Sequence, residues 1–211
     1  MPLFSLAETS RLLRFLFNPM VRVFLISLIV FALSSCGVPF RYADKEAAKN
    51  DSSFVYSLPY PKGKKHLLIQ GYNSSLSHKG RLALDFKMKK GSPVLAARSG
   101  VVAAVVESAT KGGLKNKYLH NGNYVIVRHT DGTQAYYGHL QYNGALVTVG
   151  DTVTQGQLIA KSGSTGYSAF PHLHFIVWGR NPSGGRAALP TRFQTTKGIK
   201  YLKPGGWYRS L

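Results

Sequence analysis

The chemistry that this sequence can support is concentrated in its histidines and in one aspartate. His172 and His174 are separated by Leu173, and in a β-strand this spacing places both imidazoles on one face and Leu173 on the other. Asp85 stands between two apolar residues, where a carboxylate needs a cation or several hydrogen-bond donors. Asp85 together with two of the imidazoles of His78, His172 and His174 would give zinc three protein ligands, leaving a fourth position for water as in hydrolytic sites.

Each of these residues also has a simpler interpretation. A His-x-His pair can lie solvated on a surface strand, and Asp85 can pair with Arg98 or Lys87 instead of a metal. His66 is an alternative to His78 as the first imidazole ligand. The chain has no His-Glu-x-x-His motif, so a helical zinc-peptidase motif is excluded.

Carboxylates are too scarce for most other hydrolytic mechanisms. The acidic side chains are Glu8, Asp44, Glu46, Asp51, Asp85, Glu107, Asp131 and Asp151. Glycoside hydrolysis needs two facing carboxylates, and Asp85 has no evident partner. Glu107 lies in a Val-rich run far from the other candidates. We therefore expect a histidine as the general base, because an imidazole titrates near neutral pH.

Short apolar runs separated by turn residues predict an all-β domain, an antiparallel sandwich or barrel with long loops. Asp131-Gly132 is a hairpin signal between two of the runs. The Gly- and Asn-rich segment 111–122 predicts a loop, and residues 181–211 predict an irregular C-terminal extension packed on a domain of residues 58–180. The predicted strands are Leu67–Gln70, Leu82–Phe86, Val94–Ala97, Val101–Val106, Tyr124–His129, Thr133–His139, Leu158–Lys161 and His172–Trp178.

The first 36 residues predict an export signal. Residues 23–33 are apolar apart from one serine, and three arginines precede them. At about 1.5 Å per residue, this run is too short to span a hydrocarbon core of about 30 Å, which is typical of a secretory signal. Leu33-Ser34-Ser35-Cys36 resembles a bacterial lipobox, so Cys36 is the predicted lipidation site. Residues 1–19 are interpreted as an over-long start, and residues 37–57 as a tether.

The chain carries 27 Lys and Arg residues against 8 Asp and Glu, a formal charge of +19. Such a charge favours an anionic neighbour. Export argues against nucleic acid, although the charge alone would suit it. The expected neighbours are anionic lipid head groups and the cell-wall polymer, with the lipid anchor holding the protein in the cell envelope, at the outer membrane facing the periplasm in a Gram-negative host.

Residues 56–179 resemble the M23 family of zinc endopeptidases, of the lysostaphin and LytM type. The resemblance depends on several short motifs in a fixed order. They are Gln70-Gly71-Tyr72-Asn73, Ser77-His78-x-Gly80, Ala83-Leu84-Asp85-Phe86, Gly91-Ser92-Pro93-Val94, Ala96-Ala97-Arg98, Tyr137-Gly138-His139-Leu140, Gly163-Ser164-Thr165-Gly166 and Pro171-His172-Leu173-His174-Phe175.

The resemblance implies one zinc ion bound by His78, Asp85 and His174, with His139 and His172 as catalytic histidines that do not bind the metal. It also implies peptidoglycan peptides as the substrate and suggests Tyr72 and Asn73 at the substrate cleft. The family usually has three residues between its first two ligands, whereas six separate His78 from Asp85 here, as in a subgroup with an insertion. Two alternatives stay open: a non-catalytic module that activates another wall hydrolase, and an amidase that cuts the sugar–peptide link.

Overall fold

Alternation of buried and exposed side chains builds the main sheet. In β10 (His172–Arg180), Leu173, Phe175 and Val177 are almost fully buried. Val125 and Val127 of β6 (Asn123–Arg128) are also fully buried. These residues face one apolar core, because side chains two apart on a strand share a face. The other face of the same strands is therefore available for polar residues.

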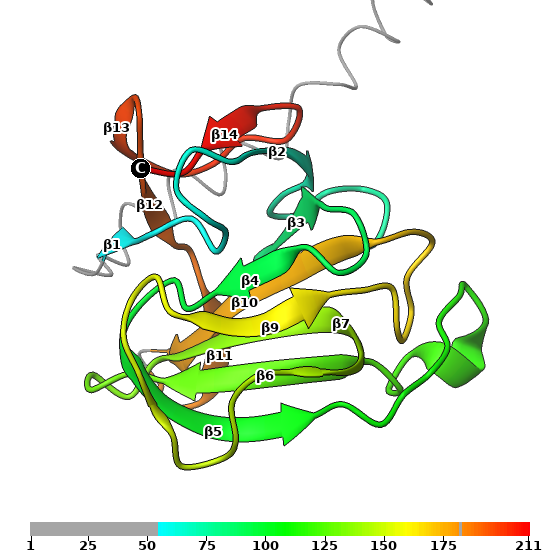
Figure 1. Ribbon diagram of the computed structural model, residues 1–211. Coiled ribbons are helices and arrows are strands. Elements are labelled where there is room, and N and C mark those ends of the chain that lie inside the picture. The colour runs from blue at the N-terminus through cyan, green and yellow to red at the C-terminus, as the bar shows by residue number, and fades with distance from the viewer. Residues whose placement is uncertain (1–54, 182) are drawn as a thin grey trace, which may run out of the picture. The chain divides into compact units, whose positions relative to one another are not determined.

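The computed structural model describes residues 55–181 and 183–211 (Figure 1). The predicted export signal, Cys36 and residues 37–54 of the predicted tether lie outside the described residues. Within the described part, the only helical element is one 3-10 turn, η1 (Asn116–Tyr118), inside the predicted loop 111–122. No described helix has the length and apolarity needed to cross a membrane. The described part of the chain is an all-β fold, as predicted.

All eight predicted strands form, with ends shifted by a few residues. The strands are β1 (Val55–Tyr56), β2 (Lys65–Gln70), β3 (Ala83–Lys87), β4 (Pro93–Leu95), β5 (Gly100–Val106), β6 (Asn123–Arg128), β7 (Gln134–Ala145), β8 (Thr152–Val153), β9 (Leu158–Ser162), β10 (His172–Arg180), β11 (Arg186–Leu189), β12 (Arg192–Thr195), β13 (Gly198–Lys200) and β14 (Trp207–Arg209). The main sheet has the order β14-β2-β3-β10-β7-β6-β5-β8, and its neighbouring strands are antiparallel.

Strand β7 folds the sheet over onto itself. Its first half pairs with β6 and β10, whereas Leu140 and Ala145 pair with β9, which in turn pairs with β4. His139 lies at the change of direction and has a positive φ of 59°, a left-handed conformation that is uncommon for a residue with a Cβ atom. The bend closes the core between the main sheet and the β4–β9 pair.

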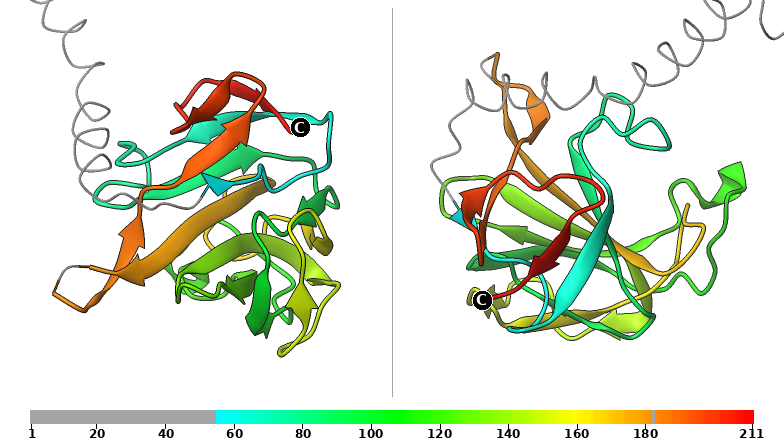
Figure 2. Two further views of the ribbon diagram at one scale, coloured as in Figure 1. Left: turned by 90° about the vertical axis from the view of Figure 1, so that its left-hand side faces the viewer. Right: turned by 90° about the horizontal axis from the view of Figure 1, so that it is seen from above.

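The C-terminal residues form regular structure that the sequence did not reveal. β11 pairs with the end of β10, β12 pairs with β1 in parallel, and β14 pairs with β2. Figure 2 shows β14, in red, beside β2 at the edge of the main sheet. Phe193 of β12 is fully buried and its ring packs against Phe86 and Phe175. Since burying one Phe side chain contributes about 1.5–3 kcal/mol, these residues contribute to the core.

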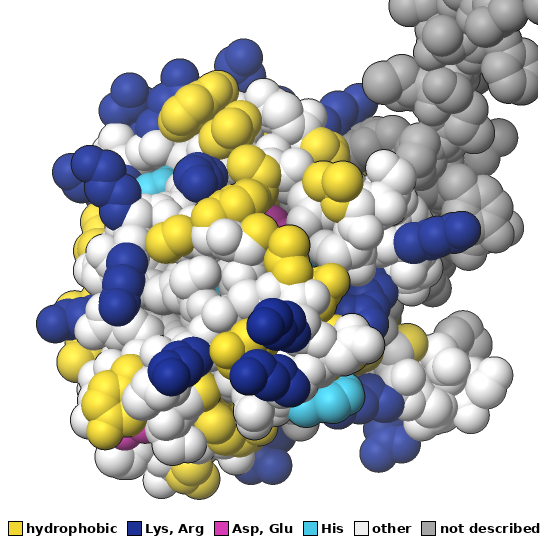
Figure 3. All heavy atoms as spheres, turned by 90° about the vertical axis from the view of Figure 1, so that its right-hand side faces the viewer, with side chains coloured by type: hydrophobic (Ala, Val, Ile, Leu, Met, Phe, Trp, Pro, Cys, Tyr) yellow, Lys and Arg dark blue, Asp and Glu magenta, His cyan; other side chains and the backbone are white. Residues whose placement is uncertain are grey.

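Three chain segments meet at the end of the sheet where β5 and β9 end and β6 and β10 begin, on the right of Figure 1. They are residues 88–92, 107–122 and 163–171, which connect β3 to β4, β5 to β6 and β9 to β10. Figure 3 views the molecule from this side and shows many Lys and Arg side chains around a band of hydrophobic ones, with little acidic surface. The predicted site residues of β3, β7 and β10 lie near this end.

Candidate metal centre

Asp85 is placed by the register of three strands. It lies directly opposite His174 in the β3–β10 pair and opposite Gln70 in the β2–β3 pair. Leu84 and Phe86 point into the core and are almost fully buried, so the Asp85 carboxylate points to the opposite face. Only 2% of its side chain is exposed. A carboxylate so buried needs cationic or hydrogen-bonding partners.

Three histidines surround this carboxylate. Nδ1 of His174 lies 2.7 Å from Asp85 Oδ1, and Nε2 of His78 lies 3.1 Å from Asp85 Oδ2. Nε2 of His172 is further away, 3.7 Å from Oδ1. One nitrogen each from His78 and His174 and one Asp85 oxygen lie within 4.8 Å of one another. The two imidazoles and the carboxylate therefore converge on one point.

Hydrogen bonds from neighbouring groups hold the carboxylate and His78. Gln70 donates from Nε2 to Asp85 Oδ2 over 2.9 Å, and its Oε1 accepts the Ser77 backbone N–H over 3.2 Å. His78 Nδ1 lies 3.1 Å from the Gly71 carbonyl oxygen. Because a carbonyl only accepts, that nitrogen carries the proton and Nε2 faces Asp85. Partners of this kind fix the tautomer and orientation of metal ligands.

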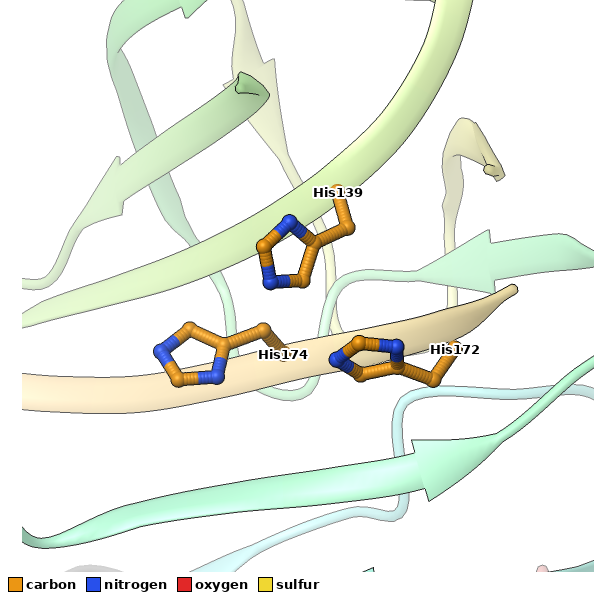
Figure 4. A group of neighbouring side chains, drawn as sticks. All are labelled: His139, His172 and His174. Atoms are coloured by element: carbon orange, nitrogen blue, oxygen red, sulfur yellow. The ribbon is translucent and has the colours of Figure 1, made fainter. Parts of the chain in front are cut away.

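His139 and His172 lie beside this centre with the same kind of orientation. His139 Nδ1 donates to the Thr165 carbonyl over 2.8 Å, and His172 Nδ1 donates to the Phe170 carbonyl over 2.8 Å. Figure 4 shows His172 and His174 side by side on β10 with His139 across from them. The centroid of the His139 ring is 4.6 Å from that of His172 and 5.4 Å from that of His174. Both His139 and His172 keep an unprotonated Nε2.

The electrostatics of the site separate its ionisable groups into two kinds. Burial alone would raise the pKa of Asp85, but hydrogen bonds from His174 and His78 and the nearby imidazole charges hold that pKa well below its ordinary value. Burial would lower the pKa of His78, yet the bond to Asp85 outweighs it and raises the pKa. Asp85 is thus an anion whose field favours a cation beside it.

The other two histidines are held neutral. Burial, reinforced by the imidazoles of His174 and His172, lowers the pKa of His139 to about 3. Burial is also the main cause that lowers the pKa of His172. At neutral pH both imidazoles are therefore proton acceptors rather than cations.

The donor set fits a divalent transition metal. A buried carboxylate that contacts several imidazoles needs positive charge between these groups, supplied either by protons on the imidazoles or by a metal ion. Two imidazoles with one carboxylate suit zinc, and they leave the fourth coordination position free. A second group, His139, His172 and His174, also has nitrogen atoms within 4.8 Å of one another. That group lacks an anion, and the Nδ1 atoms of His139 and His172 are committed to carbonyl groups.

Several predicted or alternative site residues lie elsewhere. Tyr72 is 5% exposed and its hydroxyl accepts the Thr191 backbone N–H over 2.8 Å, so the structure places it in the core. Asn73 has a positive φ of 55° in the turn after β2, and its N–H donates to the Arg81 carbonyl. His66 donates to the Lys87 carbonyl, and Arg98 pairs with Asp131, so neither competes for Asp85.

The structure also adds residues that sequence reasoning did not assign. Gln70 contacts Asp85, and the Tyr136 ring lies edge-on to His174 with ring centroids 6.1 Å apart. The space for that ring comes from Gly138, where a Cβ atom would lie 2.5 Å from the Tyr136 ring. Gln70 stood in a motif of the resemblance, but only the strand register reveals its contact.

Comparison with known families and curated proteins gives consistent matches. The family model for peptidase family M23 matches residues 78–185. Lysostaphin of Staphylococcus simulans is 39% identical over 125 residues, covering 58% of this chain and 22% of that protein. Peptidoglycan DD-endopeptidase ShyA of Vibrio cholerae is 35% identical over 108 residues, covering 50% of this chain and 22% of that protein.

An uncharacterized metalloprotease of Haemophilus influenzae is 42% identical over 98 residues, covering 46% of this chain and 18% of that protein. The chain thus spans only about a fifth of the length of these three relatives. Among solved structures, the catalytic domain of lysostaphin from Staphylococcus simulans matches with 33% identity and a TM-score of 0.41, covering 59% of this chain and 87% of that domain.

Proposed function

The chain belongs to peptidase family M23, and from this we propose that it is a zinc-dependent endopeptidase that hydrolyses peptide bonds of bacterial peptidoglycan. The observation that carries the proposal is the convergence of His78, Asp85 and His174 within 4.8 Å, next to two neutral histidines. Lysostaphin and the peptidoglycan DD-endopeptidase of Vibrio cholerae are among the similar proteins, which supports peptidoglycan as the substrate.

In this proposal His78 Nε2, Asp85 and His174 Nδ1 hold one zinc ion. A zinc ion bound there supplies a Lewis acid for the scissile carbonyl and lowers the pKa of a bound water to about 7. Asp85 supplies the negative charge of the ligand set, and Gln70 keeps the carboxylate oriented. The Gly71 carbonyl keeps the proton of His78 on Nδ1, so that Nε2 is the coordinating atom.

His139 and His172 supply the proton chemistry. Their Nε2 atoms are unprotonated and their rings are neutral, so either can receive the proton of the attacking water. The imidazolium formed in this way then stabilises the oxyanion through a hydrogen bond. It afterwards returns the proton to the leaving amine. No second carboxylate contacts this group of histidines among the described residues, which favours histidine as the base.

We also propose that the protein is exported and lipid-anchored at Cys36 in the cell envelope, at the outer membrane facing the periplasm in a Gram-negative host. The lipobox-like end of the N-terminal apolar run supports this proposal. Mass spectrometry of the processed N-terminus tests it: a diacylglyceryl group on Cys36 is expected. An unmodified Cys36 in membrane-fractionated protein contradicts it.

The experiment for the enzyme uses the full chain in detergent with purified peptidoglycan. We expect one zinc per chain, release of soluble peptide fragments, loss of release with a chelator, and recovery on adding zinc. Asp85→Asn is expected to lose both zinc and activity. Analysis of the fragments identifies the bond: a cleaved cross-link or stem peptide supports an endopeptidase, and free glycan without peptide indicates an amidase. Bound zinc with no release indicates a non-catalytic module.

A further inference from the structure

Lys87 and Phe170 form a pair at the edge of the candidate centre. The Nζ atom of Lys87 lies 4.0 Å from the centroid of the Phe170 ring, a cation–π contact. The Phe170 ring centroid is in turn 5.6 Å from that of His172. A single aromatic ring therefore separates the ammonium group from the imidazole that we propose as a catalytic residue.

The fold fixes both members of the pair. Lys87 lies opposite His172 in the β3–β10 register and two residues after Asp85, so its side chain leaves the sheet on the face of the metal centre. His66 donates a hydrogen bond to the Lys87 carbonyl over 2.7 Å. The Phe170 carbonyl accepts the His172 Nδ1–H. These two contacts fix the backbone positions from which the ammonium group and the ring extend.

Lys87 has no acidic partner in the part of the chain that is described. The segments at this end of the sheet, residues 87–92, 107–122 and 163–171, contain six lysines and one acidic residue, Glu107. The Glu107 carboxylate accepts the Ala145 N–H, and Asp85 is buried among histidines. Figure 3 shows this predominance of Lys and Arg on the surface. The ammonium of Lys87 is exposed, pre-positioned on the ring and available for an external anion.

We propose that Lys87 and Phe170 form a subsite that binds a free carboxylate of the peptide substrate, within two or three residues of the scissile bond. This inference rests on the proposed function. The separation follows from the ring contacts, because an extended peptide spans about 3.3–3.6 Å per residue. The exposed part of the Phe170 ring offers an apolar contact to the substrate, and the ammonium group takes the carboxylate as a charge-assisted hydrogen-bond acceptor.

The test compares matched synthetic stem peptides that have a free carboxylate or a carboxamide. One arm varies the C-terminal carboxylate and another varies a side-chain carboxylate near the scissile bond, so that the two sources are distinguished. For the full-length zinc-loaded chain we expect kcat/KM to be about tenfold higher for one carboxylate peptide than for its amide, equivalent to about 1.4 kcal/mol. The difference is expected mainly in KM.

Variants assign the effect to the pair. Lys87→Met is expected to remove the carboxylate preference, and Lys87→Arg is expected to keep it. Phe170→Leu retains the backbone carbonyl that holds His172 and is expected to weaken the preference. Lys90→Met is the matched control, since Lys90 is exposed in the turn that follows β3, and it should behave like the parent chain.

Binding of uncleavable analogues of both peptides, measured by calorimetry, gives a readout that does not depend on turnover. A Lys87-dependent preference for the carboxylate analogue supports the subsite. Equal binding of both analogues, or a preference that survives in Lys87→Met, overturns it. If no peptide is cleaved but the Lys87-dependent binding preference is present, the proposed function fails and the subsite stands.

Discussion

Replacing Gln70 with methionine tests whether the contacts around Asp85 exist to hold a metal. Methionine keeps the length of the side chain but removes the 2.9 Å bond to Asp85 Oδ2 and the 3.2 Å bond from the Ser77 N–H. It also removes the hydrogen bonding between Gln70 and the Ser77 hydroxyl. A hydrogen bond to a charged group contributes about 1.5–3 kcal/mol. Since the first bond orients a proposed ligand and the second fixes the start of the segment that carries His78, we expect the loss to fall on metal binding.

The expected magnitude is a 10- to 100-fold weaker zinc affinity, as is typical when a partner of a metal ligand is removed, equivalent to about 1.4–2.8 kcal/mol. Competition with a chromophoric chelator measures the affinity. Peptidoglycan hydrolysis at saturating zinc should recover to within a few-fold of the parent rate, because His139 and His172 are untouched. This recovery separates a weaker metal site from a damaged catalytic site.

Gln194→Met is the matched control, because Gln194 lies exposed on β12 and should leave zinc affinity unchanged. Thermal unfolding of both metal-free variants checks that the fold is intact. Unchanged zinc affinity in a folded Gln70→Met protein would refute the reasoning that Asp85 is a metal ligand oriented by Gln70.

The remaining predictions concern the histidines of β10, the buried His129 and the close contact at Gly163. His172→Ala should retain zinc and lose about 10²–10⁴-fold in hydrolysis, the usual contribution of a general acid–base group, whereas His174→Ala should lose both zinc and hydrolysis. Metal analysis and fragment release measure these two properties. Full activity in His172→Ala contradicts the assignment of His172 as a catalytic residue. Burial lowers the pKa of His129 below its ordinary value of 6.5, so the contribution of this histidine to stability is complete above pH 6.5 and falls as the pH drops below it. The free energy of unfolding in urea, measured at pH 5 and 7.5, should therefore change less with pH in His129→Asn than in the parent chain. An identical pH dependence in both proteins argues against His129 as the cause. Gly163→Ala would place a Cβ atom 2.4 Å from the Gln141 backbone nitrogen and should destabilise the fold by about 1–3 kcal/mol, as measured by denaturant unfolding. Gly132→Ala is the comparison and should destabilise the fold less, because its Cβ atom meets no atom within 4 Å, although Gly132 has a positive φ.

The sequence by itself determined eight of the strands, β2–β7, β9 and β10, and the faces of their side chains. Period-two alternation predicted that His172 and His174 share a face and that Leu173 lies in the core, and the buried Leu173 and Phe175 confirm the pattern. The apolar neighbours of Asp85 predicted its burial in the same way. These features are local, because they depend only on the geometry of one strand and on which residues avoid water.

The tertiary structure alone decided which of these side chains meet. The pairing of Asp85 with His174 needs the β3–β10 register, and the position of His139 needs the bend in β7, where its φ is positive. Neither is encoded in a local period. The same is true of Tyr72, whose hydroxyl meets Thr191 of the C-terminal segment, and of Lys87 over Phe170. Such contacts join residues far apart in the chain, so they exist only once the core has fixed the order and register of the strands.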